Sequence, residues 1–270
     1  MLRKIVLGMG AAGVSLAMLP LLAAFEAHVV NVTARIENAL SVSTEAIKFG
    51  TVFPQEHLNK ELSVRLSGSF ETEGRVDDVS YFIRQKPKCA VTNEFGTEIE
   101  SDTWTGHVVI DSQAPGGYTV DCDTDKPAGV TGGGVLPSLC PYISKEGNTQ
   151  LDPDETNDGT TPSFHQPWTI VQGDNPDTAA VETSYIDWLD TPGYLSKLAN
   201  DHSDVWNIDL AVPCFGGNCA QDWADFVDGI NPDANPDDYT QDIDNEHKIF
   251  GCNLWIEVND VSETPVQSQG

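Results

Sequence analysis

The two ends of the chain carry a period-two pattern, and this pattern constrains the fold most strongly. Near the start, Val30–Ile36, Leu62–Leu66 and Val79–Arg84 alternate apolar with polar residues, and Val205–Val212 and Ile249–Val258 do so near the end. Such alternation is typical of half-buried β-strands, and the turn residues between the runs recur at the spacing of a β-sandwich. We therefore expect an all-β, Ig-like β-sandwich with little helix. Further strands are expected at 40–42, 47–54 and 104–110.

The middle of the chain differs from both ends. Residues 112–203 are rich in Gly, Pro, Asn and Asp, which favour turns. We expect a long, Asp-rich, loop-rich insertion there, in a single domain that spans 25–261 and is followed by a disordered tail at 262–270. Within the insertion, 185–198 contains Pro and Gly and is expected to form short helices at best. The best helix candidate of the whole chain is 221–228.

One short run resembles a known family. Ser43–Phe53 reads STEAIKFGTVF, and the alternating Leu62–Leu66 follows it. With Phe49, Gly50 and Val52 as anchors, this run resembles the opening of Ig-like domains of the ASPM/HYDIN type. The resemblance covers about 25 residues and implies a fold, not an activity.

The N-terminus has the pattern of an export signal. Arg3 and Lys4 precede the apolar stretch 5–24, and charge returns at Glu26. This pattern predicts a signal peptide at 1–24. The alternative is a membrane anchor, since about 20 apolar residues can span a bilayer. Either reading places the rest of the chain outside the cytoplasm, in the extracellular space or on the cell surface.

The cysteines agree with export. All six follow the apolar stretch, and an even number of cysteines in an oxidising compartment predicts up to three disulfides. Zinc is the alternative, but the chain has no CxxC pair. Six cysteines allow 15 pairings. Loop closure favours Cys214 with Cys219 and Cys122 with Cys140, which leaves Cys89 with Cys252.

The charge of the chain restricts its partners. The formal net charge is −28, and such a surface repels nucleic acid and anionic lipid. We therefore expect no nucleic-acid partner, and membrane contact only through an uncleaved signal. After residue 145 there are 25 acidic residues, 19 of them Asp, against Lys197 and Lys248. Loop aspartates suit a calcium-rich or saline habitat, and the alternative is simple solubility.

The Asp-rich part contains two candidate calcium loops. If Asp233 is position 1, oxygen-bearing side chains fall at positions 3, 5, 9 and 12, in the order of an EF-hand loop. Asp238 at position 6 and Asp244 at position 12 depart from the usual Gly and Glu. The alternative is a solvated acidic loop. The candidate ligands are Asp233, Asn235, Asp237, Gln241 and Asp244, and a weaker set is Asp152, Asp154 and Asp158.

Tryptophans are candidates for sugar binding. The faces of tryptophan rings stack on sugar rings, and acidic neighbours accept hydrogen bonds from hydroxyl groups. Trp206 and Trp255 lie in strand patterns and are expected in the core or on the sheet. Trp168, Trp188 and Trp223 lie in the loop-rich part and are the candidates for glycan stacking.

No catalytic motif stands out. The chain lacks G-x-S-x-G, H-E-x-x-H and a P-loop, and its six histidines show no ligand spacing. With 42 acidic residues, a carboxylate pair suited to glycoside hydrolysis arises by chance. We therefore expect that the protein is not an enzyme.

These features favour a secreted or cell-surface structural protein, a self-assembling subunit of an extracellular filament, matrix or surface layer. The expected strand at 27–37 follows the signal directly and is suited to pair with an open sheet edge of another copy. The alternative is that it pairs within its own domain. In layout, the chain resembles secreted matrix filament proteins of the TasA/camelysin kind. The runner-up is a monomeric surface module for calcium-dependent adhesion or glycan binding, and the third reading is a secreted hydrolase.

Overall fold

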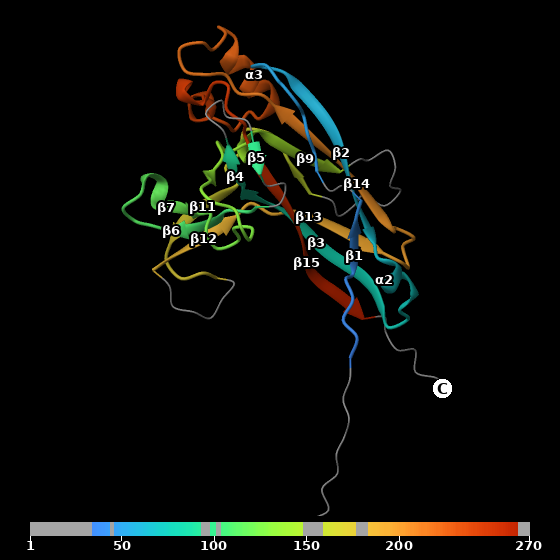
Figure 1. The fold of residues 1–270 in the computed structure, drawn as a ribbon. Helices are drawn as coiled ribbons and strands as arrows, with labels where there is room; N and C mark the ends of the chain where they lie inside the picture. The colour runs from blue at the N-terminus through green and yellow to red at the C-terminus, as the bar shows by residue number, and fades with distance from the viewer. Residues whose placement is uncertain are drawn as a thin grey trace, which may run out of the picture. The chain divides into compact units, whose positions relative to one another are not determined.

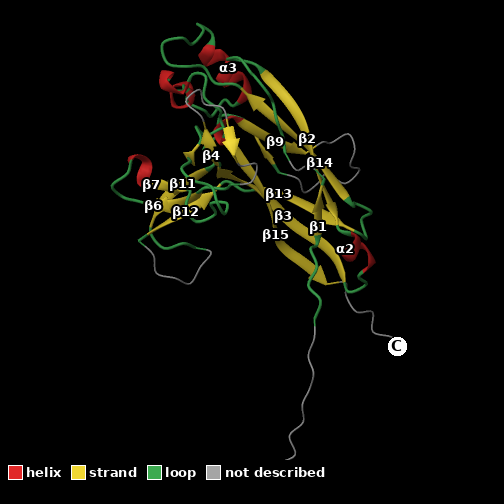
Figure 2. Cartoon of the chain, viewed as in Figure 1, coloured by secondary structure: helices red, strands yellow, loops and turns green. Residues whose placement is uncertain are grey.

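The structure is a computed structural model that describes residues 34–43, 46–92, 98–100, 104–147, 159–176 and 183–263. The chain divides into two units, Met1–Ile36 and Glu37–Gly270, and almost all described residues belong to the second. Strands predominate over helices in this part of the chain (Figures 1 and 2), which confirms the prediction of a mainly β protein with little helix.

The larger sheet is antiparallel throughout and has the strand order β1-β2-β14-β9-β10. Its centre is formed by β2 and β14, which pair from the His57–Ala211 position to the Arg65–Ser203 position. Both strands come from runs that alternate in sequence, so one face of each is apolar. The strands are β1 (Leu40–Val42), β2 (His57–Leu66), β14 (Ser203–Ala211), β9 (Ile143–Gly147) and β10 (Thr160–Thr161).

The second sheet has three antiparallel strands in the order β13-β3-β15. The central strand β3 alternates strictly between half-buried and buried residues along its 12 positions, as the period-two pattern predicts. The strands are β13 (Thr191–Ser196), β3 (Val76–Pro87) and β15 (Cys252–Glu263).

One hydrophobic core joins the two sheets. Their inward-facing residues belong to a single cluster of buried side chains, in which Trp206 and Tyr81 meet edge to face at 6.4 Å between ring centroids. Trp206 Nε1 donates a hydrogen bond to the Tyr81 hydroxyl at 2.8 Å, and that hydroxyl donates to the Asp204 carboxylate. Gly193 makes room for the tyrosine, because a Cβ there would lie 2.4 Å from the ring. The main contributors are Leu62, Val64, Val79, Tyr81, Ile83, Leu195, Trp206, Ile208 and Leu210.

Short strands and turns fill the remaining described residues. The hairpins β6–β7 and β11–β12 share a smaller buried cluster around Val108 and Trp168. The short strands are β4 (Cys89–Thr92), β5 (Glu98–Glu100), β6 (His107–Ile110), β7 (Tyr118–Asp121), β8 (Gly134–Val135), β11 (Trp168–Gln172) and β12 (Ser184–Trp188). The helical elements are α2 (Gly68–Thr72), α3 (Trp223–Ile230), η2 (Pro115–Gly117), η3 (Cys140–Tyr142), η4 (Pro236–Tyr239) and η5 (Ile243–Asn245).

The stretch 112–203, expected to be an insertion, is divided between the main sheets and the hairpins. The strands β9, β10 and β13 lie in it, yet they belong to the two main sheets. The short helices expected at 185–198 are wrong, because this segment forms most of β12 and all of β13. Pro192 is tolerated there because β13 is an edge strand, where a residue without an N–H costs no sheet hydrogen bond.

All six cysteines form disulfides, as expected. The Cys214–Cys219 pair is confirmed, and the other two pairs proposed from the sequence are wrong. Trp104 accounts for the Cys89–Cys122 bond, because its carbonyl accepts from Cys89 N and its Nε1 donates to Cys122 O. Leu139 N donates to Gly251 O, which brings Cys140 beside Cys252 and leads to the third bond. These three disulfides indicate an oxidising environment.

Candidate functional site

The outer edge of β2 is only partly paired. On one side β2 pairs with β14 along nearly its whole length, whereas on the other side β1 covers only Val64–Leu66. Ser43 N extends this contact by one bond to Ser63 O at 3.2 Å. Among the described residues, no strand pairs with positions 57–62 on that side, so about half of β2 lacks a strand partner at this edge.

The hydrogen bonds at the far end of β2 show which backbone groups face outward. Ser63 O points toward β1, while Leu66 N donates to His202 O on the β14 side. Because backbone groups alternate sides along an antiparallel strand, the N–H and C=O groups of His57, Asn59 and Glu61 point away from β14. All three side chains are exposed. The backbone N–H and C=O groups of these three residues therefore have no strand partner within the described residues.

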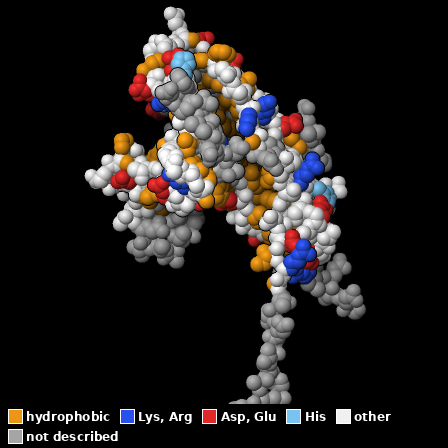
Figure 3. All heavy atoms as spheres, in the orientation of Figure 1, with side chains coloured by type: hydrophobic (Ala, Val, Ile, Leu, Met, Phe, Trp, Pro, Cys, Tyr) orange, Lys and Arg blue, Asp and Glu red, His pale blue; other side chains and the backbone are white. Residues whose placement is uncertain are grey.

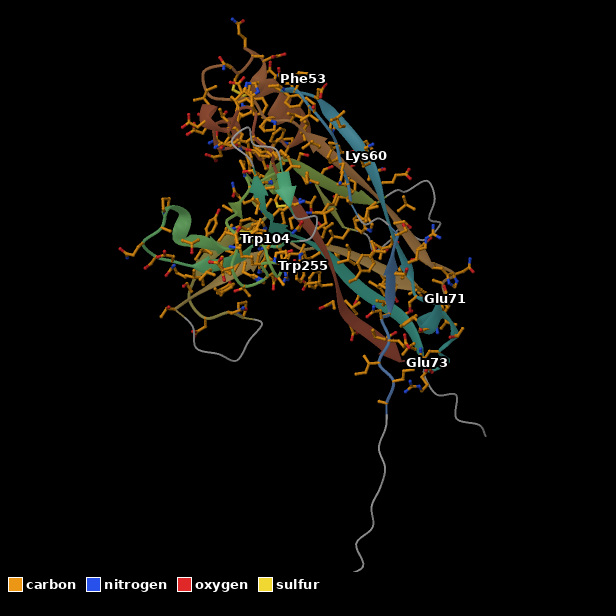
Figure 4. All side chains as sticks on the ribbon, in the orientation of Figure 1. Phe53, Lys60, Glu71, Glu73, Trp104 and Trp255 are labelled. Atoms are coloured by element: carbon orange, nitrogen blue, oxygen red, sulfur yellow. A yellow bond between two sulfur atoms is a disulfide. The ribbon has the colours of Figure 1, made fainter. Side chains whose placement is uncertain are left out.

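The surroundings of this edge leave side chains exposed. Phe53, in the turn before β2, is 64% exposed, and Lys60 is exposed in the middle of the edge (Figure 4). Residues 46–52 place Ile47, Phe49 and Val52 against the core but form no strand pairing with β2 within the described residues. The expected strand at 47–54 is therefore absent. The segment before β2 therefore contributes apolar side chains to the core without adding a strand to the sheet.

The segment expected to form an assembly strand lies at the start of the chain. Of the predicted strand 27–37, residues 27–33 lie outside the described residues, and 34–37 have no strand conformation. The side chain of Ile36 is 94% exposed. Within the described residues, the expected strand is therefore not formed at 34–37.

The five candidate calcium ligands lie in the turns around η4 and η5. The Asn235 side chain caps η4 by accepting from Asp237 N at 3.5 Å, and Gln241 Oε1 accepts from Asn245 Nδ2 at 3.1 Å. Asp233, Asp237 and Asp244 are exposed. Across the described ranges, no group of three or more His, Cys, Asp or Glu side chains is placed to hold a metal ion. The weaker candidates Asp152, Asp154 and Asp158 lie outside these ranges.

The three candidate glycan-stacking tryptophans have different surroundings. Trp168 and Trp223 are 7% and 6% exposed and pack in the two hydrophobic clusters. Trp188 is half-buried, with the Arg84 guanidinium 5.3 Å and the Lys86 ammonium 5.9 Å from its ring centroid. Burial removes Trp168 and Trp223 from contact with an external sugar, and only Trp188 keeps a partly accessible ring.

Cations and carboxylates hold the hairpin β11–β12 against the outer face of the second sheet. Arg84 forms a bidentate ion pair with Asp190 at 2.8 and 2.9 Å. Lys86 pairs with Glu257 at 3.2 Å, and its ammonium lies 3.3 Å from the centroid of the Trp255 ring. Figure 4 shows Trp255 close to Trp104. Burial works to lower the pKa of Arg84, but the Asp190 carboxylate outweighs it and raises that pKa. These cations serve the fold.

A buried polar cluster was missed from the sequence. Lys145 is 0% exposed and faces the core opposite Ile208, and its Nζ has no hydrogen-bond partner among the described residues. Burial lowers the pKa of Lys145 to about 7. Burial, with the nearby charge of Lys145, lowers the pKa of His165 to about 3, and this histidine bonds to Gln85 Oε1 at 2.5 Å. Because Lys145 and His165 are both buried, an external substrate cannot reach them.

Three comparisons with known proteins returned no match. No family model, no curated protein and no solved structure matches this chain. Within the described residues, no helix is both long enough and apolar enough to cross a membrane.

Proposed function

We propose that this protein is a secreted or cell-surface structural subunit that assembles with copies of itself into an extracellular filament, matrix or surface layer. In this proposal, residues 27–37 of one copy form a strand on the edge of β2 in another. The fold is proposed to be an Ig-like sandwich that this added strand extends. The observation that carries the proposal is the unpaired edge at positions 57–62.

Physical chemistry supports this pairing. An unpaired edge presents backbone N–H and C=O groups that readily bond to another chain. The outward groups of His57, Asn59 and Glu61 would meet a segment whose residues Val30–Ile36 alternate apolar with polar. That alternation gives the added strand one face for the core side and one for solvent. The disulfides suit a subunit that works outside the cytoplasm.

The proposed role is not enzymatic. The most perturbed pKa values belong to buried groups of the core, Lys145 and His165. A monomeric module for calcium-dependent adhesion remains the second reading from the sequence, with exposed Asp233, Asp237 and Asp244 as its candidates. A shift of the melting temperature in millimolar calcium would favour that reading.

The test is negative-stain electron microscopy of residues 25–270 and of two edge variants. We expect filaments or sheets from the parent protein and none after deletion of residues 25–37. Asn59→Pro removes an outward N–H and places a ring on the open edge, which an edge strand tolerates, so we expect it to stay folded and not to assemble.

Asn59→Thr is the matched control, because threonine keeps the N–H and favours strands. We expect this variant to assemble like the parent. A melting temperature of Asn59→Pro near that of the parent shows that the fold is intact. Filaments from both the deletion and Asn59→Pro would contradict strand exchange at β2, and dispersed particles from the parent would contradict self-assembly.

A further inference from the structure

A groove crosses the outer face of the second sheet, away from the edge of β2. It has a volume of about 550 Å³ and is lined by residues of β3, β13 and β15 together with Asp190. Figure 3 shows hydrophobic side chains exposed over these strands. Phe82 and Tyr194 are half-buried in the groove wall, and Pro192, which lies in β13 opposite Phe82, is exposed. The groove thus combines aromatic and polar groups next to the turn that connects β12 to β13.

A β-bulge directs a polar side chain into this groove. The register of β15 on β3 shifts between Val258, opposite Tyr81, and Asp260, opposite Ser80. Asn259 is the extra residue, is exposed, and lines the groove with Ser80. Bulges re-aim side chains and are common beside binding sites. The amide of Asn259 therefore offers both a donor and an acceptor at the open side of the groove.

On the opposite side the groove ends at a carboxylate of fixed orientation. Both Asp190 oxygens are bonded to the Arg84 guanidinium, and each oxygen keeps a lone pair for another donor. Tyr194 also has a carboxylate neighbour: burial and a hydrogen bond to Asp78 raise the pKa of Tyr194 to about 12. The tyrosine therefore stays neutral, and the acidic groups around it disfavour an anionic ligand.

We propose that this groove binds a neutral polysaccharide. The C–H face of a sugar ring would lie against Tyr194, because the Arg84 guanidinium already lies over the Phe82 ring at 4.8 Å from its centroid. The sugar hydroxyl groups would donate to Asp190 and exchange hydrogen bonds with Asn259 and Ser80. The net charge of −28 and the carboxylates at the groove exclude acidic sugars. This assignment does not depend on self-assembly. The proposed sugar-binding residues are thus Tyr194, Asn259 and Ser80 of the second sheet. The tryptophans Trp168 and Trp223, which the sequence favoured, are buried.

The test is isothermal titration calorimetry of the full mature chain with four neutral hexasaccharides: cellohexaose, laminarihexaose, maltohexaose and mannohexaose. We expect measurable binding of at least one of them. Tyr194→Ala and Asn259→Ala should each weaken that binding about tenfold, as expected for the loss of a stacking face or of a hydrogen bond. Asp260→Ala is the matched control, because Asp260 lies on the same bulge but does not line the groove, and it should bind like the parent.

Three outcomes would overturn the proposal. The first is no heat of binding with any hexasaccharide at millimolar concentration. The second is binding that Tyr194→Ala and Asn259→Ala leave unchanged while thermal melting shows both variants folded. The third is loss of self-association, rather than of sugar binding, in these variants, which would assign the groove to a second copy of the chain. Sugar binding that persists in Asn59→Pro would separate this site from the assembly edge.

Discussion

Lys145 is a charged residue type buried in the core, on β9 opposite Ile208. Its amine is fully buried and has no hydrogen-bond partner in the part of the chain that the structure describes, and burial lowers its pKa from 10.5 to about 7. Because the unfolded chain binds this proton more tightly, it holds more protons than the native state between pH 7 and pH 10.5. The contribution of Lys145 to stability should therefore rise with pH across this window, and its full burial cost should apply below pH 7.

Lys145→Met tests this assignment. Methionine keeps the length of the side chain and removes the charge, so we expect the variant to be more stable than the parent at pH 7. The difference should shrink toward pH 10.5, by on the order of 4 kcal/mol in all. Urea unfolding at several pH values measures it. Parallel stability curves for the two proteins would show that Lys145 keeps an ordinary pKa.

Among the secondary-structure elements, α2 has its C-terminal end stabilised by the ammonium group of Lys197. Lys197 Nζ donates to Phe70 O at 3.2 Å, a carbonyl that also accepts from Glu73 N at 3.1 Å, and to Glu73 O at 2.6 Å, beyond the last turn of the helix. At the other side of α2, His202 pairs with Glu71 at 2.7 Å. The segment 197–202 therefore closes the C-terminal end of the helix.

Lys197→Met should cost about 2 kcal/mol of unfolding free energy, since charge-assisted hydrogen bonds of this kind contribute roughly that much. Lys248→Met is the matched control, because it makes the same change of charge at an exposed residue whose contact is to Asn245 at 3.1 Å. We expect that variant to lie within about 0.5 kcal/mol of the parent. Equal losses in both variants, measured by urea unfolding, would mean that charge alone sets the effect.

Periodicity located the long elements well. The runs around 62–66, 79–84, 205–212 and 249–258 became β2, β3, β14 and β15, and the helix expected at 221–228 became α3 at Trp223–Ile230. The prediction failed at 185–198, because the sequence does not show that β13 is an edge strand, where proline is tolerated. The partly unpaired edge of β2 was likewise not predictable, since it depends on which strands become neighbours in space.

At the scale of the whole molecule, the sequence predicted that all six cysteines pair but identified only one of the three pairs. Nearest-neighbour loop closure identified Cys214–Cys219 only. The run Gly132–Gly134 between Cys122 and Cys140 predicts a loop that joins these two cysteines, but Gly134 starts β8, which pairs with β4 and sets Val135 opposite Cys89. Tertiary contacts that join distant segments thus decided the other two bonds.

The Cys140–Cys252 disulfide should contribute most to stability, because it closes the longest loop. Its cysteines are 112 residues apart, against 5 for Cys214–Cys219. The chain-entropy estimate gives about 5 kcal/mol for the long loop and about 2 kcal/mol for the short one. We expect the Cys140→Ala/Cys252→Ala double variant to unfold at a markedly lower guanidinium concentration than Cys214→Ala/Cys219→Ala. The double variant of Cys89–Cys122, with a separation of 33, should fall between them. If the short-loop variant were the least stable of the three, packing around Cys214 in the core, rather than loop entropy, would govern the effect.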